Sequence, residues 1–597
     1  MTEPFILLDD ARANGAPAEG AKDARLYRAP LEVIVARRPE EVAPALERIG
    51  GDQNGEWAGY IAYEAGLALE PKLASRAAKR SGATGPLLWF GRFAGYETIP
   101  ASQVPNWLNA NASTGNSRTR LGPLEPQLSP GGYARAFTEM VEAIRAGDIY
   151  QGNLTFPLAG SWQGDPVALY AAIRGDASAG HGGLIWDGSH WLLSFSPELF
   201  FALKDGEATV RPMKGTAPRG RSDAEDKALA EALSSSTKNR AENLMIVDLM
   251  RNDLSRVAEP GSVQVTAPFA VESYPTVHQM VSTVRARVSE GVGARELVQV
   301  LFPCGSITGA PKIRAMELID QVERDARGPY CGAIGRIDAT GDAAFNVAIR
   351  TLRLDPAAGR AVMGVGSAVV ADSDCMDEWR ECAIKGNFLR QSAASFDLIE
   401  TMAFDPAQGV PLLELHLERM KQSASELGFA FDRHAVRNQI QALCFEIDHA
   451  ARLRLVLARS GAIALEAAPM PKAMELARCA ILPLPVSDGD LRLRHKTSDR
   501  GFYEEALKVA KSAGADEALL IRDDERLTEG SFTNIFVARG DVLATPPLAL
   551  GLLPGILRRS LLESGRAVEA DLRLDDLSGG FFIGNALRGL IPAQLIG

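Results

Sequence analysis

Cysteine is scarce in this chain, with 6 in 597 residues. No two of them stand in a CxxC pair or at metal-ligand spacing: Cys304, Cys331, Cys375, Cys382, Cys444 and Cys479. This excludes a disulfide-rich secreted scaffold and a cysteine-bound zinc module. Reduced thiols in a cytoplasmic protein are the expectation that follows.

Long apolar runs and basic clusters are also missing. No apolar stretch approaches the roughly 18 residues of a membrane span, and the N-terminal MTEPFILLDDARANG lacks the basic and apolar regions of an export signal. The formal net charge is −11, and no long run of Lys and Arg offers a surface for nucleic acid or an anionic membrane. We therefore expect a cytoplasmic protein with neither of those partners. An anionic substrate would need local cationic groups or a bridging metal.

Length and composition indicate several ordinary domains. Of the 597 residues, 46% are hydrophobic and 23% are charged, as in folded globular proteins. The polar stretch NWLNANASTGNSRTRLGPLEP is predicted as a loop that closes a first part, and a second boundary falls near GNFLRQSAASFDLIETM. We expect an α+β protein in three parts, residues 1–122, 123–390 and 395–597.

Apolar spacing places some elements within these parts. YARAFTEMVEAIRAGDI and DKALAEALSSSTKNRAENLMIVDLMRNDL are predicted to be helical, and AAFNVAIRTLRL is β-rich. In the last part, RLRLVLA and EALLIRD are predicted as strands.

Five charged residues between 133 and 390 stand in settings that suit chemistry. Glu198, in the apolar string SFSPELF, would be desolvated, which raises a carboxyl pKa and suits a general acid. Lys214, in RPMKGTAPRG, is a candidate nucleophile if burial lowers its pKa. Glu242 falls on one helix, and Glu378 and Glu381 share a face of another, so carboxylates from two helices could hold Mg²⁺. Each has a plain alternative: a salt bridge, a surface lysine in a turn, or solvated helices.

Two glycine-rich strings add weaker signals. FPCGSITGAPKIRAMELID (302–320) is predicted as a turn that leads into a helix, whose free N–H groups can bind carboxylates or phosphates. It lacks the spacing of a Walker loop. GVGSAVVADSD (364–374) is predicted as a second close-approach turn after a strand.

These strings gain meaning together. In order along the chain stand GDIYQGNLT, SPELF, KGT, AENLMIVDLMRNDLSRV, YPTVHQMVS, FPCGSITGAPK, RGPYCGAIG, AIRT and EWRECAIK. Residues 133–390 thereby resemble the chorismate-utilising enzymes, which include anthranilate synthase, aminodeoxychorismate synthase component I, isochorismate synthase and salicylate synthase. Residues 1–120, with GYIAYEAG, resemble the N-terminal part of the same fold.

The resemblance implies roles for individual residues. Glu242 and Glu381 would hold a Mg²⁺ that bridges the C1 carboxylate of chorismate, with Glu378 as an indirect ligand. Glu198 would assist departure of the C4 hydroxyl. The substrate-contact positions are Gln151, Thr308, Tyr330, Arg350 and Gly366.

Three positions bear on which member is resembled. Water-adding members carry a lysine base where this chain has Gln151, which disfavours hydroxylation. Anthranilate synthases usually read PIAGT where this chain reads PMKGT, so Lys214 resembles the lysine of aminodeoxychorismate synthase component I. That lysine attacks C2 and ejects the C4 hydroxyl, and ammonia then adds at C4; two successive allylic displacements return the new group to C4. His278, a catalytic candidate, matches a histidine that anthranilate synthases share.

The chain offers no second region for releasing ammonia from glutamine. Cys331 and the pair His416 and Glu418 superficially suit an amidotransferase, but they belong to the strings RGPYCGAIG and LELHLERM. A separate glutamine amidotransferase subunit, or free ammonium, is therefore expected.

Past residue 395 a second group of strings occurs: ETM, LELHLERM, RHKTSDR, LTEGSFTNIFV, TPPLALGLLPGILR and GNALRGL. Taken singly, they suggest surface charge and ordinary turns. Their order resembles fold-type IV pyridoxal-phosphate enzymes, which include branched-chain and D-amino acid aminotransferases and aminodeoxychorismate lyase. The resemblance implies that Lys496 bonds the cofactor, that Glu529 pairs with its pyridinium nitrogen and that Arg419 binds its phosphate. The remaining cofactor-site positions are Ser531, Asn534, Gly555, Ile556 and Leu557.

Some details of this second half differ from the family pattern. Thr401 matches a threonine that the lyases place near the cofactor, where we expect it to move a proton as pyruvate leaves. Ala586 stands where NSLRG is usual, so one hydroxyl contact is missing, and the opening strands of stand-alone members are absent. Because such active sites are commonly built at dimer interfaces, a homodimer through this part is expected.

The two resemblances correspond to two consecutive steps of one pathway. The first half would make aminodeoxychorismate from chorismate, and the second would cleave it to 4-aminobenzoate and pyruvate. Three alternatives stay open: a true branched-chain or D-amino acid transaminase as the second half, anthranilate synthase activity in the first, or one inactive half that serves as a scaffold. The intact set of charged residues speaks against the last.

Overall fold

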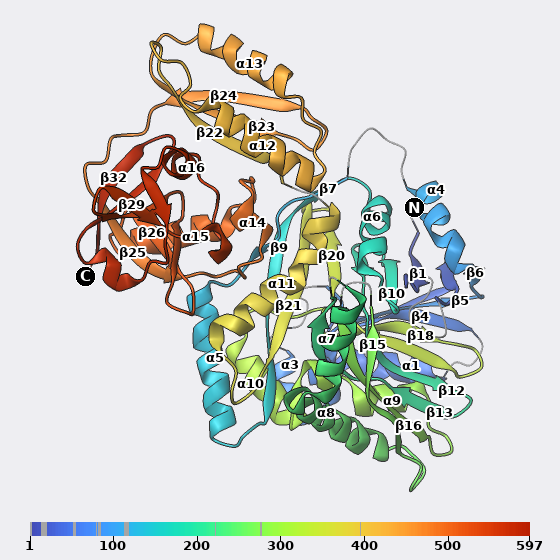
Figure 1. The fold of residues 1–597 in the computed structure, drawn as a ribbon. Helices are drawn as coiled ribbons and strands as arrows, with labels where there is room; N and C mark the ends of the chain where they lie inside the picture. Colours follow the sequence, from blue (N-terminus) through green and yellow to red (C-terminus); the bar gives the residue numbers. More distant parts are fainter. Residues whose placement is uncertain are drawn as a thin grey trace. The chain divides into compact units, whose positions relative to one another are not determined.

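The computed structural model describes residues 3–12, 21–51, 55–78, 80, 85–112, 119–220, 222–274, 277–393 and 396–596. The chain divides into two compact units, Met1–Ala393 and Ala394–Gly597 (Figure 1). Residues 1–122 and 123–390 both lie in the first unit, because strands from both ranges share its two sheets. No helix within the described residues is both long and apolar enough to span a membrane.

The first sheet of unit 1 has 11 antiparallel strands. In spatial order they are β17 (Gly309–Ala310), β9 (Gln151–Gln163), β21 (Arg360–Val369), β20 (Thr351–Asp355), β11 (Trp191–Ser194), β10 (Gly182–Trp186), β1 (Phe5–Asp9), β2 (Ala24–Arg28) and β6 (Glu97–Ile99), with β7 (Arg120–Leu121) and β8 (Glu125–Pro126) on β9. The glycines of GVGSAVV lie inside β21, so the expected turn is a strand.

The second sheet of unit 1 has 10 strands. They are β14 (Met213–Pro218), β16 (Val277–Arg287), β13 (Glu207–Val210), β12 (Leu199–Lys204), β19 (Ala343–Val347), β18 (Ala333–Ile337), β4 (Glu56–Ile61), β5 (Leu88–Phe93) and β3 (Glu32–Ala36), with β15 (Gln264–Ser273) on β16. Residues 195–198 and 348–350 carry the chain from one sheet to the other. These two crossings position Glu198 and Arg350.

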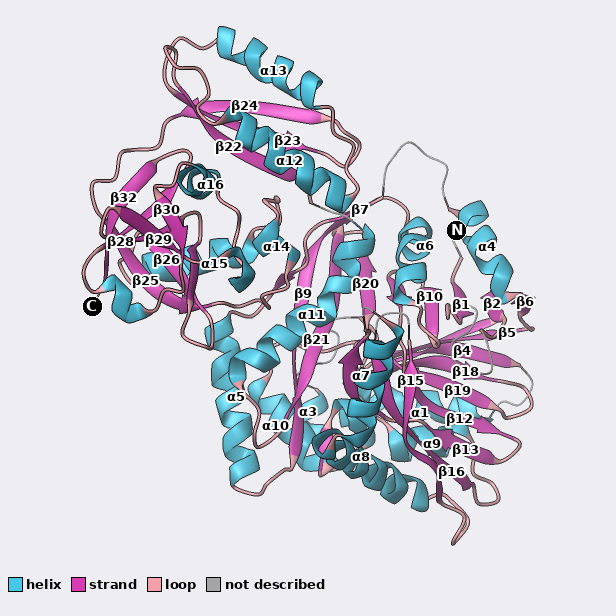
Figure 2. Cartoon of the chain, in the orientation of Figure 1, coloured by secondary structure: helices cyan, strands magenta, loops and turns pink. Residues whose placement is uncertain are grey.

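Helices flank both sheets (Figure 2). They are α1 (Pro39–Gly51), α2 (Ala65–Leu69), α3 (Ala74–Ala77), α4 (Val104–Asn111), α5 (Pro130–Arg145), α6 (Pro166–Ala177), α7 (Asp223–Ser235), α8 (Thr237–Ser255), α9 (Ala294–Leu301), α10 (Lys312–Val322) and α11 (Cys375–Ala393), with turns η1 (Ala101–Gln103) and η2 (Gly305–Ile307). The predicted loop NWLNAN is part of α4. The predicted long helix is divided into two helices, α7 and α8. The division falls at Ser236, which is extended and caps α8 by accepting from the N–H of Asn239.

The helix predicted from Tyr133 is α5, whose N-cap Ser129 accepts a hydrogen bond from the N–H of Gly132. Its apolar face joins the core against β9 and β21. Trp379 of α11 stacks on Phe156 of β9 with ring centroids 4.7 Å apart, and Tyr133 meets Trp379 edge-on at 5.4 Å. These aromatic contacts fix α11, the helix that carries Glu378 and Glu381, against the first sheet.

Unit 2 contains a small sheet and a larger one. The small sheet is β22 (Leu398–Phe404), β23 (Ala451–Leu457) and β24 (Ile463–Pro469), packed against α12 (Leu413–Leu427) and α13 (Arg433–Phe445). The predicted strand RLRLVLA is confirmed as β23, whose alternate residues are buried, because one face is covered by the helices and the other is not.

The larger sheet has 8 strands, and the additional pairing of β27 with β28 closes part of it into a ring. Its strands are β27 (Leu527–Gly530), β26 (Glu517–Ile521), β25 (Ala477–Pro483), β32 (Gly589–Leu595), β31 (Phe581–Asn585), β28 (Asn534–Arg539), β29 (Val542–Thr545) and β30 (Ala567–Glu569). The helices and turns are α14 (Leu491–Arg494), α15 (Gly501–Ser512), α16 (Ile556–Glu563), η3 (Leu548–Leu550) and η4 (Leu574–Leu577). EALLIRD is confirmed as β26.

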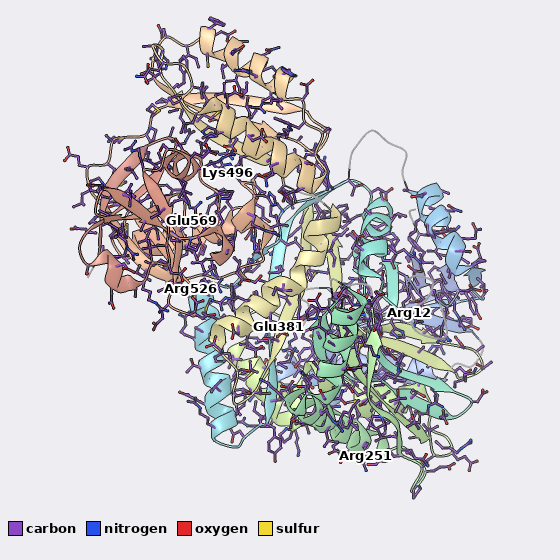
Figure 3. The ribbon with its side chains drawn as sticks, in the orientation of Figure 1. Arg12, Arg251, Glu381, Lys496, Arg526 and Glu569 are labelled. Carbon is purple, nitrogen blue, oxygen red and sulfur yellow. The ribbon has the colours of Figure 1, made fainter. Side chains whose placement is uncertain are left out.

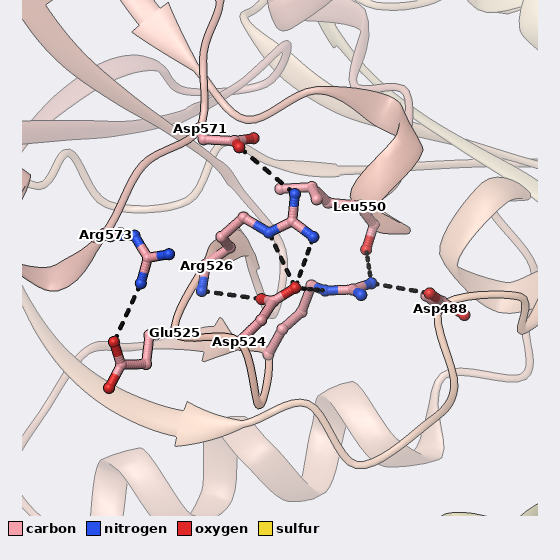
Figure 4. Close-up of polar contacts among 8 residues, drawn as sticks. Asp488, Asp524, Glu525, Arg526, Leu550, Asp571 and Arg573 are labelled. Atoms are coloured by element: carbon pink, nitrogen blue, oxygen red, sulfur yellow. Dashed lines mark hydrogen bonds and ion pairs between the residues drawn. The ribbon is translucent and has the colours of Figure 1, made fainter.

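Charged side chains at the rim of the larger sheet form an ion-pair network (Figure 4). Asp524 accepts from Arg522 and Arg526, Arg526 also reaches Asp571, and Arg522 reaches Asp488. The network tethers the turn before β27. Because its members are partly exposed to solvent, these pairs contribute little to stability.

Candidate active sites

A buried arginine ties together three segments of unit 1. The guanidinium of Arg327 pairs with Glu323 at 2.7 Å and donates to the carbonyls of Ile307 (2.8 Å) and Asn153 (2.6 Å). The carboxylate of Glu64 accepts the backbone N–H of Arg327 at 2.7 Å. Both charged side chains of the ion pair are at most 3% exposed. The cluster therefore sets the position of η2, of β9 and of the turn that leads to Tyr330.

Glu198 lies in the first crossing between the sheets, directly before β12 and not within a strand. Its side chain is buried, and one carboxylate oxygen accepts from the hydroxyl of Ser306 at 2.8 Å. Burial raises the pKa of Glu198 to about 7, although Ser306 and the ammonium of Lys214 oppose the rise. A carboxyl group with that pKa can hold a proton near neutral pH and donate it, as a general acid requires.

Lys214 lies on β14 at a bulge between Met213 and Thr216. Gly215 has φ +89°, and a Cβ there would meet Asn239 at 3.0 Å, so glycine suits this position. Burial lowers the pKa of Lys214, while the carboxylates of Glu242, Glu381 and Glu198 oppose the change. Lys214 is thus neither exposed nor in a turn, and a larger share of its amine is unprotonated than in water.

The three predicted metal carboxylates come from α8 and α11. Lys385 pairs with Glu381 at 2.6 Å and donates to the Gly366 carbonyl at 2.8 Å. Burial opposes ionisation of Glu381, but Lys385 outweighs it and lowers the pKa; burial and Glu381 together raise the pKa of Glu378. Glu242 lies on α8, close enough to act on Lys214. In the described part of the chain, no three acidic, His or Cys side chains form a ready-made metal cluster.

Gln151, Thr308 and Gly366 line β9 and its neighbours. Gln151 is fully buried, and neither of its amide atoms has a hydrogen-bond partner among the described residues. Thr308 donates to the Cys304 carbonyl at 3.1 Å, and its own carbonyl accepts from Asn153 at 2.8 Å. Gly366 pairs with Thr155 across the β9–β21 ladder. A buried amide with both ends free is available to a polar ligand.

Arg350 lies in the second crossing, and the neighbour of Tyr330, Cys331, donates its N–H to the Ala348 carbonyl of that crossing at 3.1 Å. The ring of Tyr330 lies where a Cβ on Gly364 would be, 2.0 Å from the nearest ring atom, so only glycine fits at that position of β21. Arg350 has φ +48°, and burial lowers its pKa. Among the described residues it forms no ion pair. A largely buried guanidinium without a carboxylate partner favours an anionic ligand.

His278 lies on β16 with both ring nitrogens occupied. Nδ1 lies 2.9 Å from the Ser273 hydroxyl, and Nε2 lies 2.9 Å from Asp226. Its strand partner on β14 is Ala217, three residues from Lys214. A catalytic role would require one of these contacts to open, so that role stays a prediction.

In unit 2, Lys496 follows α14 and lies beside β22, where the Ile399 N–H donates to its carbonyl at 2.9 Å (Figure 3). Burial lowers the pKa of Lys496 to about 7, and Glu400 opposes the shift. Three guanidinium groups add to the lowering: those of Arg419, Arg500 and Arg454. The amine is therefore substantially neutral near pH 7, as a lysine that attacks a carbonyl group must be.

Arg419 lies on α12 between a carboxylate and a turn. Its guanidinium makes two contacts with Glu400, at 2.8 and 2.6 Å, and donates to the Pro554 carbonyl at 2.9 Å. The Nδ1 of His416 also meets Glu400, at 2.7 Å. Arg419 thus joins the small sheet to the turn before α16.

That turn presents a helix start. Gly555 caps α16, and Ile556 and Leu557 are its first residues, whose N–H groups lack helical partners. A Cβ on Gly555 would lie 1.8 Å from the Asn534 side-chain oxygen, and Asn534 also donates to the Leu553 carbonyl at 3.2 Å. These free N–H groups can bind an anion such as a phosphate.

Glu529 lies on β27, opposite Asn534 on β28. It is 3% exposed, and burial raises its pKa to about 7. The hydroxyl of Tyr503 donates to it at 2.5 Å. Ser531, two residues on, binds Glu517 through both its N–H and its hydroxyl. Ser531 therefore shapes the loop, and its hydroxyl is already engaged.

Thr401 lies on β22 directly opposite Arg454 on β23. Arg454 forms no ion pair with any described residue, and it acts on Lys496. Ala586 lies in the turn after β31, where Asn585 accepts the N–H groups of Leu587 and Arg588. The turn is closed by the side-chain oxygen of Asn585, which needs no hydroxyl at position 586.

Comparison with known proteins follows this division. The chorismate binding enzyme family matches residues 5–391. The chain belongs to that family. Class IV amino-transferases match residues 397–596. The chain is thus a chorismate-binding enzyme followed by a fold-type IV aminotransferase domain, as the sequence predicted, and the second domain implies pyridoxal phosphate as a cofactor.

Individual relatives agree with the first match. An aminodeoxychorismate synthase of Streptomyces griseus is 44% identical over 265 residues, covering 44% of this chain and 36% of that protein. Aminodeoxychorismate synthase component 1 of Klebsiella aerogenes is 39% identical over 282 residues, covering 47% and 62%. The anthranilate synthase component I structure of Streptococcus pneumoniae superposes with a TM-score of 0.50 at 26% identity, covering 65% of this chain and 92% of that one. The matches thus span less than two thirds of the length of the two aminodeoxychorismate synthases.

The residues of unit 2 fit the implied cofactor. An amine with a lowered pKa, a buried carboxylate and a glycine-capped helix start with a nearby arginine are what its aldehyde, ring nitrogen and phosphate require. Sequence reasoning missed several partners. Ser306, Arg327 and Lys385 lie within strings that resemble the chorismate-utilising enzymes, near the residues to which that resemblance gives roles. Arg454 and Tyr503 lie outside those strings, and only the fold brings them to the site.

The buried Arg327 generates a stability prediction. Arg327→Met should lower the free energy of unfolding of unit 1 by about 3 kcal/mol or more, because Glu323 is left as an unpaired buried charge. All 7 tryptophans belong to unit 1, so their fluorescence in urea reports on that unit. Adding Glu323→Gln should recover part of the loss. A loss below about 1 kcal/mol, as for an exposed pair, would contradict the argument.

Proposed function

We propose that this protein converts chorismate to 4-aminobenzoate, with amination at C4 in unit 1 and elimination of pyruvate in unit 2. The observation that carries the first step is that Lys214, a half-buried amine with a lowered pKa, lies within electrostatic reach of the buried carboxyl group of Glu198. The aminodeoxychorismate synthases among the relatives support the same step.

The amination uses two displacements. The neutral amine of Lys214 attacks C2, the ring double bond shifts, and the C4 hydroxyl leaves as water with the proton held by Glu198. Ammonia then attacks C4, the double bond shifts back, and Lys214 is expelled from C2. The hydroxyl is thereby exchanged for an amino group at the same carbon. We assign Gln151, Thr308, Tyr330, Arg350 and Gly366 to substrate binding.

We also propose Mg²⁺ in unit 1, held by Glu242 and Glu381, with Glu378 nearby. Carboxylates from α8 and α11 both act on Lys214, and the charge of Glu381 raises the pKa of Glu378. Such a group of acidic side chains suits a hard divalent cation, which would supply positive charge for a substrate carboxylate. The contact between Lys385 and Glu381 would have to yield.

Partners and surroundings follow from the same proposal. Because relatives are named component 1, we propose that a glutamine amidotransferase subunit supplies the ammonia. The six cysteines are free, which suits a reducing cytoplasm. A homodimer through unit 2 is proposed from the resemblance to fold-type IV enzymes.

For unit 2 we propose the lyase reaction. When bound, pyridoxal phosphate acts as an electron sink. Lys496 bonds it, Glu529 orients its ring nitrogen, and Arg419 with the N–H groups of α16 holds its phosphate. We assign proton transfer during pyruvate release to Thr401. Arg454, opposite Thr401 and without a carboxylate partner, favours a substrate with carboxylate groups. A branched-chain transaminase would not need that guanidinium beside an apolar side chain.

The deciding experiment is product identification. Purified protein is incubated with chorismate, Mg²⁺, ammonium and pyridoxal phosphate, and the products are separated against standards. We expect 4-aminobenzoate with equimolar pyruvate. Anthranilate would overturn the assignment of unit 1. Aminodeoxychorismate without 4-aminobenzoate would overturn the lyase assignment and favour a transaminase in unit 2.

Lys214→Ala should abolish amination at C4, because no nucleophile remains to attack C2. Consumption of chorismate with ammonium is the measurement. Lys227→Ala is the matched control, since Lys227 is 80% exposed and pairs with Glu231 at the surface of the same unit, and it should retain activity. Normal amination by Lys214→Ala would contradict the covalent route.

Lys496→Ala should remove the visible absorbance of lysine-bound pyridoxal phosphate and let aminodeoxychorismate accumulate from chorismate. Lys508→Ala, which alters a lysine that is 78% exposed on α15, should change neither readout. Formation of 4-aminobenzoate at the wild-type rate by Lys496→Ala would show that another lysine bonds the cofactor.

A further inference from the structure

Glu529 faces a conflict between its burial and its proposed task. To pair with a protonated ring nitrogen it must be ionised, yet burial favours its neutral form. Four groups act on it besides burial. Three favour the ion, namely the Tyr503 hydroxyl, the Leu553 N–H and the Arg500 guanidinium, and the Glu517 carboxylate opposes it.

Tyr503 makes the largest of the favourable contacts. It lies on α15, is 3% exposed, and its hydroxyl donates to Glu529 at 2.5 Å. Hydrogen bonds to a charged acceptor are roughly twice as strong as neutral ones. The ring packs in the core between α15 and the larger sheet, so the hydroxyl is held in place from behind.

Arg500 supports Tyr503 from the other side. Its guanidinium lies 4.4 Å from the centre of the Tyr503 ring and donates to the Ser531 carbonyl at 2.7 Å. A cation over the ring face lies close to both the hydroxyl and the carboxylate that it serves. Arg500 therefore links Tyr503 to the strand and loop that carry Glu529.

We infer that Tyr503 is a positioning residue which, with Arg500 stacked on its ring, holds Glu529 ionised and aimed at the cofactor nitrogen. The inference rests on the proposed cofactor role of Glu529 and deepens it. No group is transferred by Tyr503, which acts only by donating its hydrogen bond.

The test is Tyr503→Phe, which removes the hydroxyl and keeps the ring. Apo protein is titrated with pyridoxal phosphate, and the dissociation constant is measured by absorbance at several pH values. We expect roughly tenfold weaker binding near neutral pH, because a hydrogen bond to a charged group is lost. The kcat of pyruvate formation should fall more than KM changes.

The pH dependence of cofactor affinity tests the protonation of Glu529. In the wild type, cofactor affinity should fall as the pH drops through about 7, where Glu529 takes up a proton. Loss of the Tyr503 donor raises the pKa of Glu529 further, so the fall should begin at a higher pH in the variant. Protonation of Lys496 also weakens binding at low pH, but it does so in both proteins, and the difference between them isolates Glu529.

Tyr60→Phe is the matched control, because Tyr60 is a buried tyrosine of unit 1 whose hydroxyl donates to Asp187 at 2.8 Å. It should lower stability without changing cofactor affinity. Equal affinity and equal pH dependence for Tyr503→Phe and wild type would overturn the inference and leave the cofactor role standing. Failure of the wild type itself to bind pyridoxal phosphate would instead overturn the proposed function.

Discussion

The contact between Arg327 and Glu323 is the constraint on which the rest of unit 1 depends. Two opposite charges that are almost completely buried repay their desolvation only when every remaining donor is satisfied. Here the guanidinium satisfies that demand with carbonyls from two separate segments, Ile307 and Asn153. Because the guanidinium must keep both contacts, the cluster fixes the positions of these two segments relative to each other. The solvated network around Arg526 in Figure 4 has more ion pairs and constrains far less.

Desolvation then supplies the chemistry in both units. Burial brings the pKa of Glu198 up to about 7 and that of Lys496 down to about 7, and it lowers the pKa of Lys214. An acid that keeps its proton and an amine that loses it can then coexist near neutral pH. The cost of burying these groups is offset by the surrounding core, so the fold and the reactivity arise from the same packing.

The sequence identified candidate charged residues for both proposed sites, whose roles stay predictions, but it did not identify their surroundings. Strings such as SPELF and RHKTSDR point to Glu198 and Lys496 because each string is a short continuous stretch of the chain that resembles a family motif. Tyr503 and Arg454 could not be found that way, since their roles arise from contacts across strands and helices far apart in the chain. Local reading also failed at GVGSAVV, where glycines suggested a turn. They lie in the strand β21. Glycine is required at position 364 because the ring of Tyr330 occupies the space that a side chain there would fill.

The two units share one electrostatic feature despite their different folds. Each presents a guanidinium with no carboxylate partner among the described residues, Arg350 in unit 1 and Arg454 in unit 2. In a chain of net charge −11, a partly buried guanidinium without a carboxylate partner favours an anionic ligand. Replacing the C4 hydroxyl of chorismate by an amine leaves both carboxylates in place. The proposed product of unit 1 therefore keeps the negative charge that Arg454 of unit 2 favours, which is a physical reason to propose that the two sites serve one substrate in succession.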